Sequence, residues 1–158
     1  QFHAIWRVVF HRKERFMLYG IGCDLCEVAR MEKSLSGAHG PAFVRRVFGP
    51  AEQAALGLGA EAEPWPAGRA SAHKAASAAA DFAAKEAFLK AAGTGLAAPF
   101  SLCEIEAVRL PSGAPNYRFS GKTAEWVAAH HLTAKLSLSH DGGMALAFCT
   151  LEQLPPET

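Results

Sequence analysis

The sequence predicts a single domain built from both helices and strands, and three observations lead to this prediction. The chain has 158 residues, which suffices for one domain and is short for two of ordinary size. Its residues are 50% hydrophobic and 20% charged, a balance that favours a packed core over disorder. A long alanine-rich stretch has helical character, and the sequence after it alternates between apolar and polar residues as strands do.

The first expected elements are a strand and a helix. The strand covers 17–23, MLYGIGC, where Gly20 and Gly22 allow another backbone or a ligand to approach closely. Asp24 is expected to end this strand and to cap the following helix, because an aspartate at a helix start accepts hydrogen bonds from free backbone N–H groups. That helix is expected to run to about Ser34.

Two more helices are expected in the middle of the chain. The first covers about 41–57 and is interrupted at 49–50, where a Gly-Pro pair stands. Residues 57–69 have the Gly, Pro and acidic content of a flexible surface loop. The alanine-rich helix follows at about 70–92 and is ended by Gly93, because glycine readily adopts the left-handed conformation that closes a helix.

The C-terminal part is expected to be rich in strands. An Asp-Gly pair at 141–142 between two alternating runs is a strong hairpin signal. The expected elements are, in order, a strand at 101–110, a turn at 111–116, a returning strand at 117–119, a helix at about 121–131, and two strands at 135–140 and 144–151.

The net charge of +1 weakens the case for a general nucleic-acid binder. It averages over two unequal parts: residues 1–16 carry four basic residues and one acidic residue, and residues 17–158 carry 12 basic and 14 acidic residues. The basic segment lacks a signal-peptide pattern, so we interpret it as an upstream or non-native extension rather than a basic amphipathic arm. No apolar stretch approaches the roughly 20 residues that span a bilayer, so we expect no membrane-crossing segment.

The four cysteines are interpreted as reduced thiols of a cytoplasmic protein. Cys23 and Cys26 form a C-x-x-C pair, but no second pair or matching histidines follow, as a zinc site would need. The pair also lacks the setting of a thioredoxin-like motif. A zinc or disulfide function is therefore not expected.

Glu86 is the most informative residue of the alanine-rich helix. At about 100° per residue it falls on the same side as Phe82 and Leu89, and Lys90 follows one turn later. A carboxylate inside an apolar stripe costs several kcal/mol unless a cation meets it. The alternative is an exposed Glu-to-Lys pair worth only ~0.3–0.5 kcal/mol. The apolar neighbours favour a buried partner for Glu86.

Asp24 has two interpretations, as a helix cap or as a ligand of a phosphate-bearing cation. Mg²⁺ typically takes one or two carboxylates and leaves its other positions to water and phosphate oxygens. Asp24 together with Glu86 satisfies that count.

Two other segments have both a structural and a functional interpretation. His140 either forms hydrogen bonds at a hairpin corner or contacts a phosphate and accepts a proton. It is expected to share one strand face with Leu136 and Leu138, which leaves the serines at 137 and 139 on the opposite face. The Gly-Thr-Gly at 93–95 either caps the helix or offers backbone N–H groups to a phosphate.

Three blocks, taken together and in this order, resemble the small holo-acyl-carrier-protein synthases, a class of 4′-phosphopantetheinyl transferases. They are MLYGIGCDLCEVARM at 17–31, FAAKEAFLKAAGTG at 82–95 and LSLSHDGGMALAF at 136–148. The segment 43–53 is a weaker match, with Gly49 where the family often has Thr. The resemblance covers essentially all of 17–151 and marks Met17 as the expected start of the natural chain.

The resemblance implies roles for individual residues. Asp24 and Glu86 match the family's Mg²⁺ ligands, and Lys90 matches the lysine near the coenzyme A pyrophosphate. His140, followed by Asp141, matches the active-site histidine. On helix one, Arg30 matches a basic residue that faces the acidic carrier protein, and Glu27 precedes it. The positions in coenzyme A-binding blocks are Lys85, Gly93, Thr94, Gly95, Ser137 and Ser139.

The resemblance further implies an α+β fold with a small antiparallel sheet, a long central helix and shorter helices, assembled as a homotrimer with sites between subunits. Two features depart from the family. Asp81 stands before Phe82 where Arg is common, which puts a phosphate or inter-subunit contact in doubt. The loop 57–69 is longer than in compact members, so Lys74 and its neighbours are candidates for a nucleotide-phosphate contact.

The function that follows is Mg²⁺-dependent transfer of the phosphopantetheine arm of coenzyme A to a serine of apo acyl carrier protein, a step of fatty acid biosynthesis and lipid metabolism. The proton of that serine would go to Glu86 through a bound water, or to His140 assisted by Asp141. Two rival interpretations are a non-catalytic subunit that binds the carrier protein and a metal-dependent nucleotide phosphohydrolase. The first has no need of both Asp24 and Glu86, and the second needs more Asp and His than the chain offers.

Overall fold

The computed structural model describes residues 17–59 and 65–154. The expectation about residues 1–16 therefore lies outside the described residues. The elements are β1 (Met17–Glu27), α1 (Val28–Ser36), α2 (Gly40–Val47), α3 (Pro50–Leu56), α4 (Gly68–Ala92), the 3₁₀ turn η1 (Leu102–Glu104), β2 (Ile105–Arg109), β3 (Pro115–Phe119), α5 (Gly121–Ala129), β4 (Leu132–Asp141) and β5 (Met144–Gln153).

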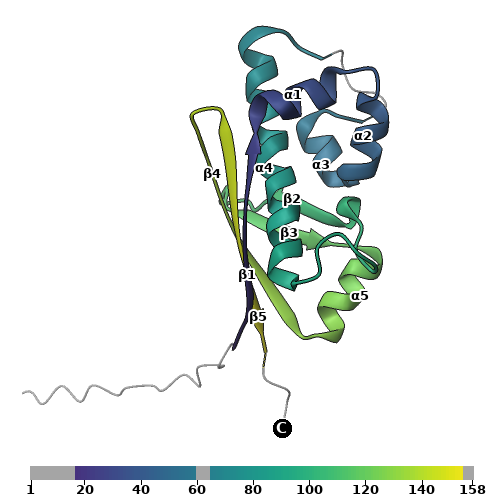
Figure 1. The fold of residues 1–158 in the computed structure, drawn as a ribbon, viewed down its shortest axis with the longest axis vertical. Coiled ribbons are helices and arrows are strands. Elements are labelled where there is room, and N and C mark those ends of the chain that lie inside the picture. Colours follow the sequence, from purple (N-terminus) through teal and green to yellow (C-terminus); the bar gives the residue numbers. More distant parts are fainter. Residues whose placement is uncertain (1–16, 60–64, 155–158) are drawn as a thin grey trace, which may run out of the picture.

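The long helix α4 packs against an antiparallel sheet of three strands in the order β1-β5-β4 (Figure 1). The shorter helices α1, α2 and α3 lie beside the N-terminal half of α4, and α5 lies towards its other end (Figure 1). The strands β2 and β3 form a separate antiparallel pair. Among the described residues, no helix is both long and apolar enough to cross a membrane. The α+β class predicted from the sequence is confirmed.

Two glycines of β1 let the strand lie directly on the backbone of α4. A Cβ atom added to Gly20 would stand 2.0 Å from the carbonyl oxygen of Ala91, and one added to Gly22 would stand 1.9 Å from that of Ala87. Such distances leave no room for any side chain, so both positions require glycine. This close approach places the middle of β1 beside the C-terminal half of α4.

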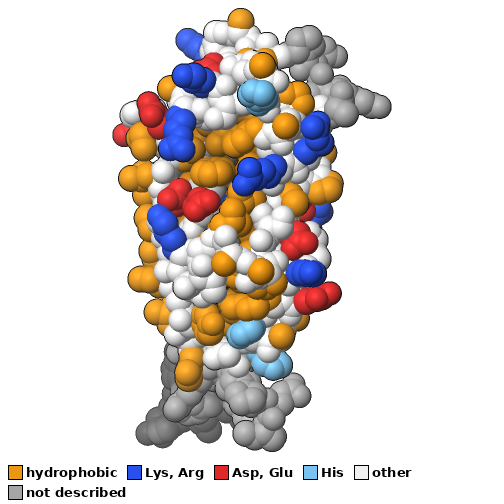
Figure 2. Space-filling model, turned by 45° about the vertical axis from the view of Figure 1, so that its right-hand side comes forward, with side chains coloured by type: hydrophobic (Ala, Val, Ile, Leu, Met, Phe, Trp, Pro, Cys, Tyr) orange, Lys and Arg blue, Asp and Glu red, His pale blue; other side chains and the backbone are white. Residues whose placement is uncertain are grey.

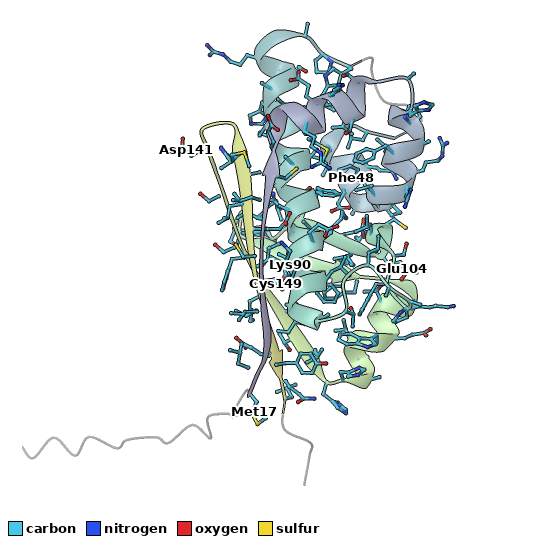
Figure 3. The ribbon with its side chains drawn as sticks, in the orientation of Figure 1. Met17, Phe48, Lys90, Glu104, Asp141 and Cys149 are labelled. Atoms are coloured by element: carbon cyan, nitrogen blue, oxygen red, sulfur yellow. The ribbon has the colours of Figure 1, made fainter. Side chains whose placement is uncertain are left out.

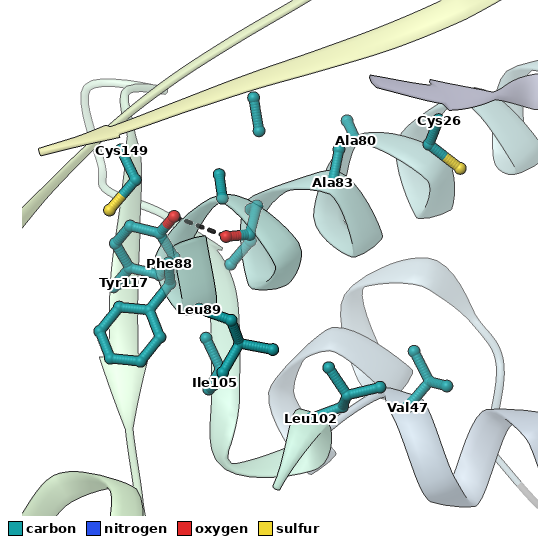
Figure 4. Packing of buried hydrophobic residues seen from close by; sticks show 14 of the residues in the cluster. Cys26, Val47, Ala80, Ala83, Phe88, Leu89, Leu102, Ile105, Tyr117 and Cys149 are labelled. Atoms are coloured by element: carbon teal, nitrogen blue, oxygen red, sulfur yellow. Dashed lines mark hydrogen bonds between the residues drawn. The ribbon is translucent and has the colours of Figure 1, made fainter. Parts of the chain in front are cut away.

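The core is built from alanines on α4 and an aromatic cluster at its C-terminal half (Figure 4). The ring of Phe88 is fully buried and lies 5.7 Å from that of Phe100 and 4.8 Å from that of Phe119, measured between centroids. The hydroxyl of Tyr117 donates a hydrogen bond of 2.7 Å to the carbonyl oxygen of Ala84. These contacts fix β3 against α4.

Several local predictions are confirmed. The interruption at 49–50 separates α2 from α3, and Gly93 adopts the left-handed conformation, with φ of 77°, after the last residue of α4. The strands β4 and β5 form the expected hairpin, in which Gly142 and Gly143 make the turn with φ of 56° and 80°.

The expected helix cap at Asp24 is wrong. The strand β1 runs on to Glu27, and Asp24 pairs with Ala147 of β5 inside the sheet. The residue before α1 is Glu27, whose side chain makes no capping hydrogen bond. The expected strand at 101–110 is also shorter, because its first residues form η1.

Candidate active site

A cavity of about 350 Å³ lies where β1, α1, α2 and α4 meet. Its wall combines three carboxylates and a guanidinium with apolar side chains, and the face drawn in Figure 2 likewise carries acidic and basic groups among apolar ones. The lining residues are Asp24, Leu25, Cys26, Glu27, Arg30, Met31, Ser34, Phe43, Phe82 and Glu86.

Asp24 enters this cavity from the middle of β1, on the face of the sheet that packs on α4. Its Oδ1 atom lies 2.8 Å from the ammonium nitrogen of Lys90, which also donates a hydrogen bond of 2.9 Å to the carbonyl oxygen of Cys23. The side chain of Lys90 is 52% exposed and that of Asp24 is 17% exposed. The hydrogen bond with Asp24 raises the pKa of Lys90, so the ammonium form is favoured.

Glu86 reaches the same cavity from α4 and is half-buried. Burial raises the pKa of Glu86, the negative charge of Asp24 raises it further, and the positive charge of Lys90 lowers it. The carboxylate of Asp24 therefore disfavours the charged form of Glu86. A cation placed between them relieves that repulsion.

The residue types around the cavity fit a magnesium ion. Within residues 17–59 and 65–154, no group of three or more His, Cys, Asp or Glu side chains is arranged to hold a metal. Mg²⁺ does not need such a cage, because it usually binds through one or two carboxylates and completes its shell with water and phosphate oxygens. Asp24 and Glu86, lining one cavity, offer that donor set.

His140 and Asp141 lie apart from this cavity in the single chain. Both are exposed at the tip of the β4–β5 hairpin, where Figure 3 labels Asp141. They line a second cavity, of about 410 Å³, together with Val28 of α1 and Ala76 of α4. The structure therefore does not bring His140 to Glu86 within one subunit.

The remaining predicted phosphate-binding positions lie on exposed surfaces. Gly93, Thr94 and Gly95 follow the end of α4, and all three are exposed. Ser137 and Ser139 are exposed on the outer face of the sheet, the face turned away from α4. This distribution leaves them open to a ligand or to another subunit.

The two predicted lysines at 85 and 74 have partners inside the chain. Lys85 is fully buried, and its ammonium lies 2.5 Å from a carboxylate oxygen of Glu52, so its expected contact with coenzyme A does not fit the structure. Lys74 donates a hydrogen bond of 2.7 Å to the carbonyl oxygen of Gly57, and its ammonium lies 5.0 Å from the ring centre of Trp65. Lys74 lines a third cavity, separate from the one that holds Glu86.

Arg30 and Glu27, the predicted docking residues, border the cavity of Asp24 and are exposed. Sequence reasoning did not connect Phe43 and Phe82 with this cavity, because their helical spacing indicated only that they are buried. Asp81, which replaces a family arginine, is buried and lies 3.2 Å from the guanidinium of Arg109.

Comparisons with known proteins agree with this geometry. The sequence profile of the 4′-phosphopantetheinyl transferase superfamily matches residues 20–149. The holo-[acyl-carrier-protein] synthase of Methylobacterium sp. (strain 4-46) is 40% identical over 147 residues, which cover 90% of this chain and 99% of that protein. The protein of the same name from Delftia acidovorans is 36% identical over 137 residues, with coverage of 87% and 98%.

Solved structures give the same result. The holo-[acyl-carrier-protein] synthase of Neisseria meningitidis superimposes with a TM-score of 0.69 at 29% identity, covering 87% of this chain and all of that one. The synthase from Bacillus anthracis, solved in complex with CoA (3′,5′-ADP), has a TM-score of 0.66 at 29% identity and covers 87% and 98% of the two chains.

Fold and site thus define a phosphopantetheinyl transferase by class. The chain belongs to the 4′-phosphopantetheinyl transferase superfamily. The resemblance drawn from the three sequence blocks is confirmed, and so is the prediction of a transferase.

Proposed function

We propose that this chain transfers the 4′-phosphopantetheine arm of coenzyme A to a serine hydroxyl of apo acyl carrier protein and releases adenosine 3′,5′-bisphosphate. The observation that carries the proposal is the meeting of Asp24 and Glu86 at one cavity beside Arg30, with Lys90 in an ion pair with Asp24. The relatives named holo-[acyl-carrier-protein] synthase and the structure solved with CoA (3′,5′-ADP) support the choice of substrates.

In the transfer, the serine oxygen of the carrier forms a bond to the phosphorus next to the pantetheine arm. The bond from that phosphorus to the bridging oxygen breaks, and the bisphosphate leaves with the electron pair. We assign Asp24 and Glu86 to hold Mg²⁺, which would neutralise charge on the pyrophosphate oxygens. Lys90 adds a compact positive charge that favours departure of the leaving oxygen.

Glu86 is our candidate for the group that accepts the serine proton. It lines the cavity beside Arg30, where a bound water would pass the serine proton to its carboxylate. His140 with Asp141 is the alternative, and in one subunit it lines a different cavity. We therefore favour Glu86 as the base, since it is the one of the two that lines the cavity of Asp24.

We also propose a homotrimer with sites between subunits. The outer face of the sheet carries Ile21 at 57% exposure, Leu25 at 58% and Phe148 at 41%, a set of apolar side chains that an isolated chain would leave in water. Ser137 pairs with Phe148 across the sheet, so it lies on this same face. A subunit seated there would bring the serines beside a neighbour, where coenzyme A phosphates would bind with the loop at 93–95.

We further propose that the protein is cytoplasmic. The four cysteines, at 23, 26, 103 and 149, are free, which supports this location.

One assay tests the transfer. The protein is mixed with Mg²⁺, coenzyme A and apo acyl carrier protein, and the carrier is weighed by mass spectrometry. Transfer adds the arm with its phosphate, a gain of about 340 Da, because the phosphate stays bonded to the serine. A carrier of unchanged mass would support a non-catalytic binding subunit, and release of nucleotide without modified carrier would support a phosphohydrolase. Omitting Mg²⁺ and adding a chelator tests the metal requirement.

Arg30→Ala tests the docking assignment. Arg30 is exposed at the rim of the cavity and forms no ion pair with a described residue, so its charge is available to an acidic carrier. Removing it should raise the KM for carrier protein by about tenfold, the effect of losing about 1.4 kcal/mol of binding. The KM for coenzyme A should stay unchanged. An equal rise in both KM values would contradict the assignment, and Arg46→Ala on the exposed face of α2 is the charge-matched control.

A further inference from the structure

Lys85 lies one residue before Glu86, but its side chain enters the core between α4 and the segment of α3, η1 and β2. Its ammonium contacts a carboxylate oxygen of Glu52 at 2.5 Å and donates hydrogen bonds to the carbonyl oxygens of Leu102, at 3.2 Å, and Ile105, at 2.5 Å. Both members of the Lys85–Glu52 pair are fully buried. Three donor positions of the ammonium are thus used within the chain.

The carboxylate of Glu52, which accepts from Lys85, is itself held by hydrogen bonds from the backbone. The second carboxylate oxygen of Glu52 accepts a hydrogen bond of 2.8 Å from the backbone N–H of Ala107. The first accepts one of 2.9 Å from the N–H of Gly49, at the start of α3. Glu52 is therefore tied to β2 and to the start of its own helix, and Lys85 joins α4 to a point that cannot shift without breaking these bonds.

Stability alone does not account for such a pair. A buried ion pair is often no more stabilising than apolar side chains of the same volume, because both charges lose their hydration. What it does supply is a single defined position of the two elements it joins, since its hydrogen bonds are satisfied only in one arrangement. The nearby part of α4 depends on such an anchor, because the small side chains of Ala83, Ala84 and Ala87 interlock only weakly with neighbouring elements.

We propose that the Lys85–Glu52 pair positions Glu86 by fixing where α4 lies along its axis relative to β1 and Asp24. Because the two residues are adjacent in one rigid helix, a shift at Lys85 moves Glu86 by the same amount. Lys85 is thus a positioning residue that acts through Glu86 and does not touch the substrates. The inference rests on the proposed function, because it concerns the metal site assigned to Asp24 and Glu86.

The test removes the ion pair without leaving a buried charge. In the double variant Lys85→Met with Glu52→Gln, the amide oxygen can still accept from Ala107, and the amide NH₂ replaces the oxygen that accepted from Lys85 and Gly49. Mn²⁺ binding is measured by electron paramagnetic resonance with coenzyme A present, and thermal unfolding is followed in parallel. We expect the double variant to stay folded with weaker Mn²⁺ binding, by about 10–100-fold, as for other groups that orient metal ligands.

Matched controls separate position from general loosening. Asp81→Asn breaks another ion pair of α4, one turn away, and should leave Mn²⁺ affinity unchanged. Wild-type Mn²⁺ affinity in a folded double variant would overturn the inference. If the wild-type protein and Glu86→Gln bound Mn²⁺ equally, the proposed metal site itself would fail, which is a separate outcome.

A second variant covers the case in which the double variant does not fold. Glu52→Asp keeps both charges and draws the anchoring oxygen back by one methylene, so the tether is shifted rather than removed. It should also weaken Mn²⁺ binding and lower kcat, while the KM for carrier protein stays as in the wild type. Unchanged Mn²⁺ affinity in Glu52→Asp would equally overturn the positioning role.

Discussion

At the scale of single residues, the balance of charges around Glu86 determines what the site can do. Glu86 is half-buried, next to one carboxylate, Asp24, whose own charge is met by Lys90. Burial and Asp24 together disfavour the charged form of Glu86. A divalent cation would reverse this effect, so metal binding and proton release at Glu86 are expected to be coupled.

Glu86→Gln tests this coupling directly. The amide keeps the shape of the side chain but cannot hold a proton or offer a negative charge, so Mg²⁺-dependent turnover should be lost. Thermal unfolding should stay at or slightly above the wild-type temperature, because a half-buried charge close to Asp24 has been removed. Steady-state kinetics and a melting curve are the measurements. Near-normal turnover would refute the assignment of Glu86 as ligand and base.

Asp81 makes stability depend on pH. Burial raises the pKa of Asp81 from 3.8 to about 7, helped by the charge of Glu52 and opposed by Arg109 and Lys85. The folded state therefore binds a proton that the unfolded state releases, so this residue lowers stability as pH rises from 4 through 7. Asp81→Asn should abolish that loss, and its stability advantage over the wild type should grow by about 2–3 kcal/mol between pH 5 and pH 8.

Denaturant unfolding at several pH values measures this effect. The exposed carboxylate of Glu125 on α5 provides the control, since Glu125→Gln should follow the wild-type pH profile. Parallel profiles for Asp81→Asn and the wild type would show that Arg109 keeps Asp81 ionised throughout the range.

At the scale of elements, α3 begins after a glycine, Gly49, which has no side chain to cap the helix. The backbone N–H of Ala51, in the first turn of α3, donates instead to Glu106 of β2 at 2.7 Å. Glu106 is buried and is also held by the guanidinium of Arg118 at 2.7 Å. A Cβ atom on Gly49 would stand 2.5 Å from this carboxylate. The glycine at a position where the family often has Thr is thus explained by the remote cap.

A double-mutant cycle tests whether a threonine hydroxyl at position 49 can replace the carboxylate of Glu106 as the cap of α3. Gly49→Thr alone should destabilise the protein by about 1–3 kcal/mol, because the new side chain overlaps the buried Glu106. In a Glu106→Ala background the space is open and the threonine hydroxyl can cap α3 itself, so the same substitution should cost less or stabilise. The expected coupling is about 1–2 kcal/mol, measured by denaturant unfolding. Additive effects would mean that Glu106 does not act as the cap.

Among the helices and strands, the sequence could predict the turns and helix ends but not the full extent of β1. Gly93 and the hairpin turn at Gly142 were predictable, because left-handed conformation and turn type depend on a few adjacent residues. The continuation of β1 through Asp24 was not, because pairing with Ala147, distant in sequence, outweighs the local signal for a helix cap.

Within the site, the sequence indicated Glu86 through its conflict with an apolar stripe, and the resemblance paired it with Asp24. The burial of Lys85 could not be read in the same way. Its partner Glu52 is 33 positions away, and only the folded chain shows that they meet. The block resemblance therefore predicts a contact with coenzyme A for a lysine whose ammonium lies in the core.

At the scale of the whole molecule, the two faces of the three-stranded sheet differ in their burial. One face packs on α4 and includes the fully buried Ala145 and Ala147. The other carries Ile21, Leu25 and Phe148, each at least 41% exposed, in adjacent positions of β1 and β5. An apolar sheet face of this kind is characteristic of an interface between subunits. The serines of β4 on the same face link assembly to the proposed coenzyme A site.

The double variant Ile21→Lys with Leu25→Lys tests whether assembly uses this face. Two charges on the outward face of β1, at positions on either side of Cys23, should prevent close packing of a second subunit, because each would be buried without a partner. Light scattering after size-exclusion chromatography should show three times the chain mass for the wild type and one for the variant. The rate of carrier-protein modification should decrease when assembly is lost, since Ser137 and Ser139 would no longer lie beside a neighbouring subunit. Leu110→Lys, at an exposed apolar position outside the three-stranded sheet, is the matched control and should remain assembled and active. A double variant that stays trimeric would place the interface on another surface and would separate Ser137 and Ser139 from it.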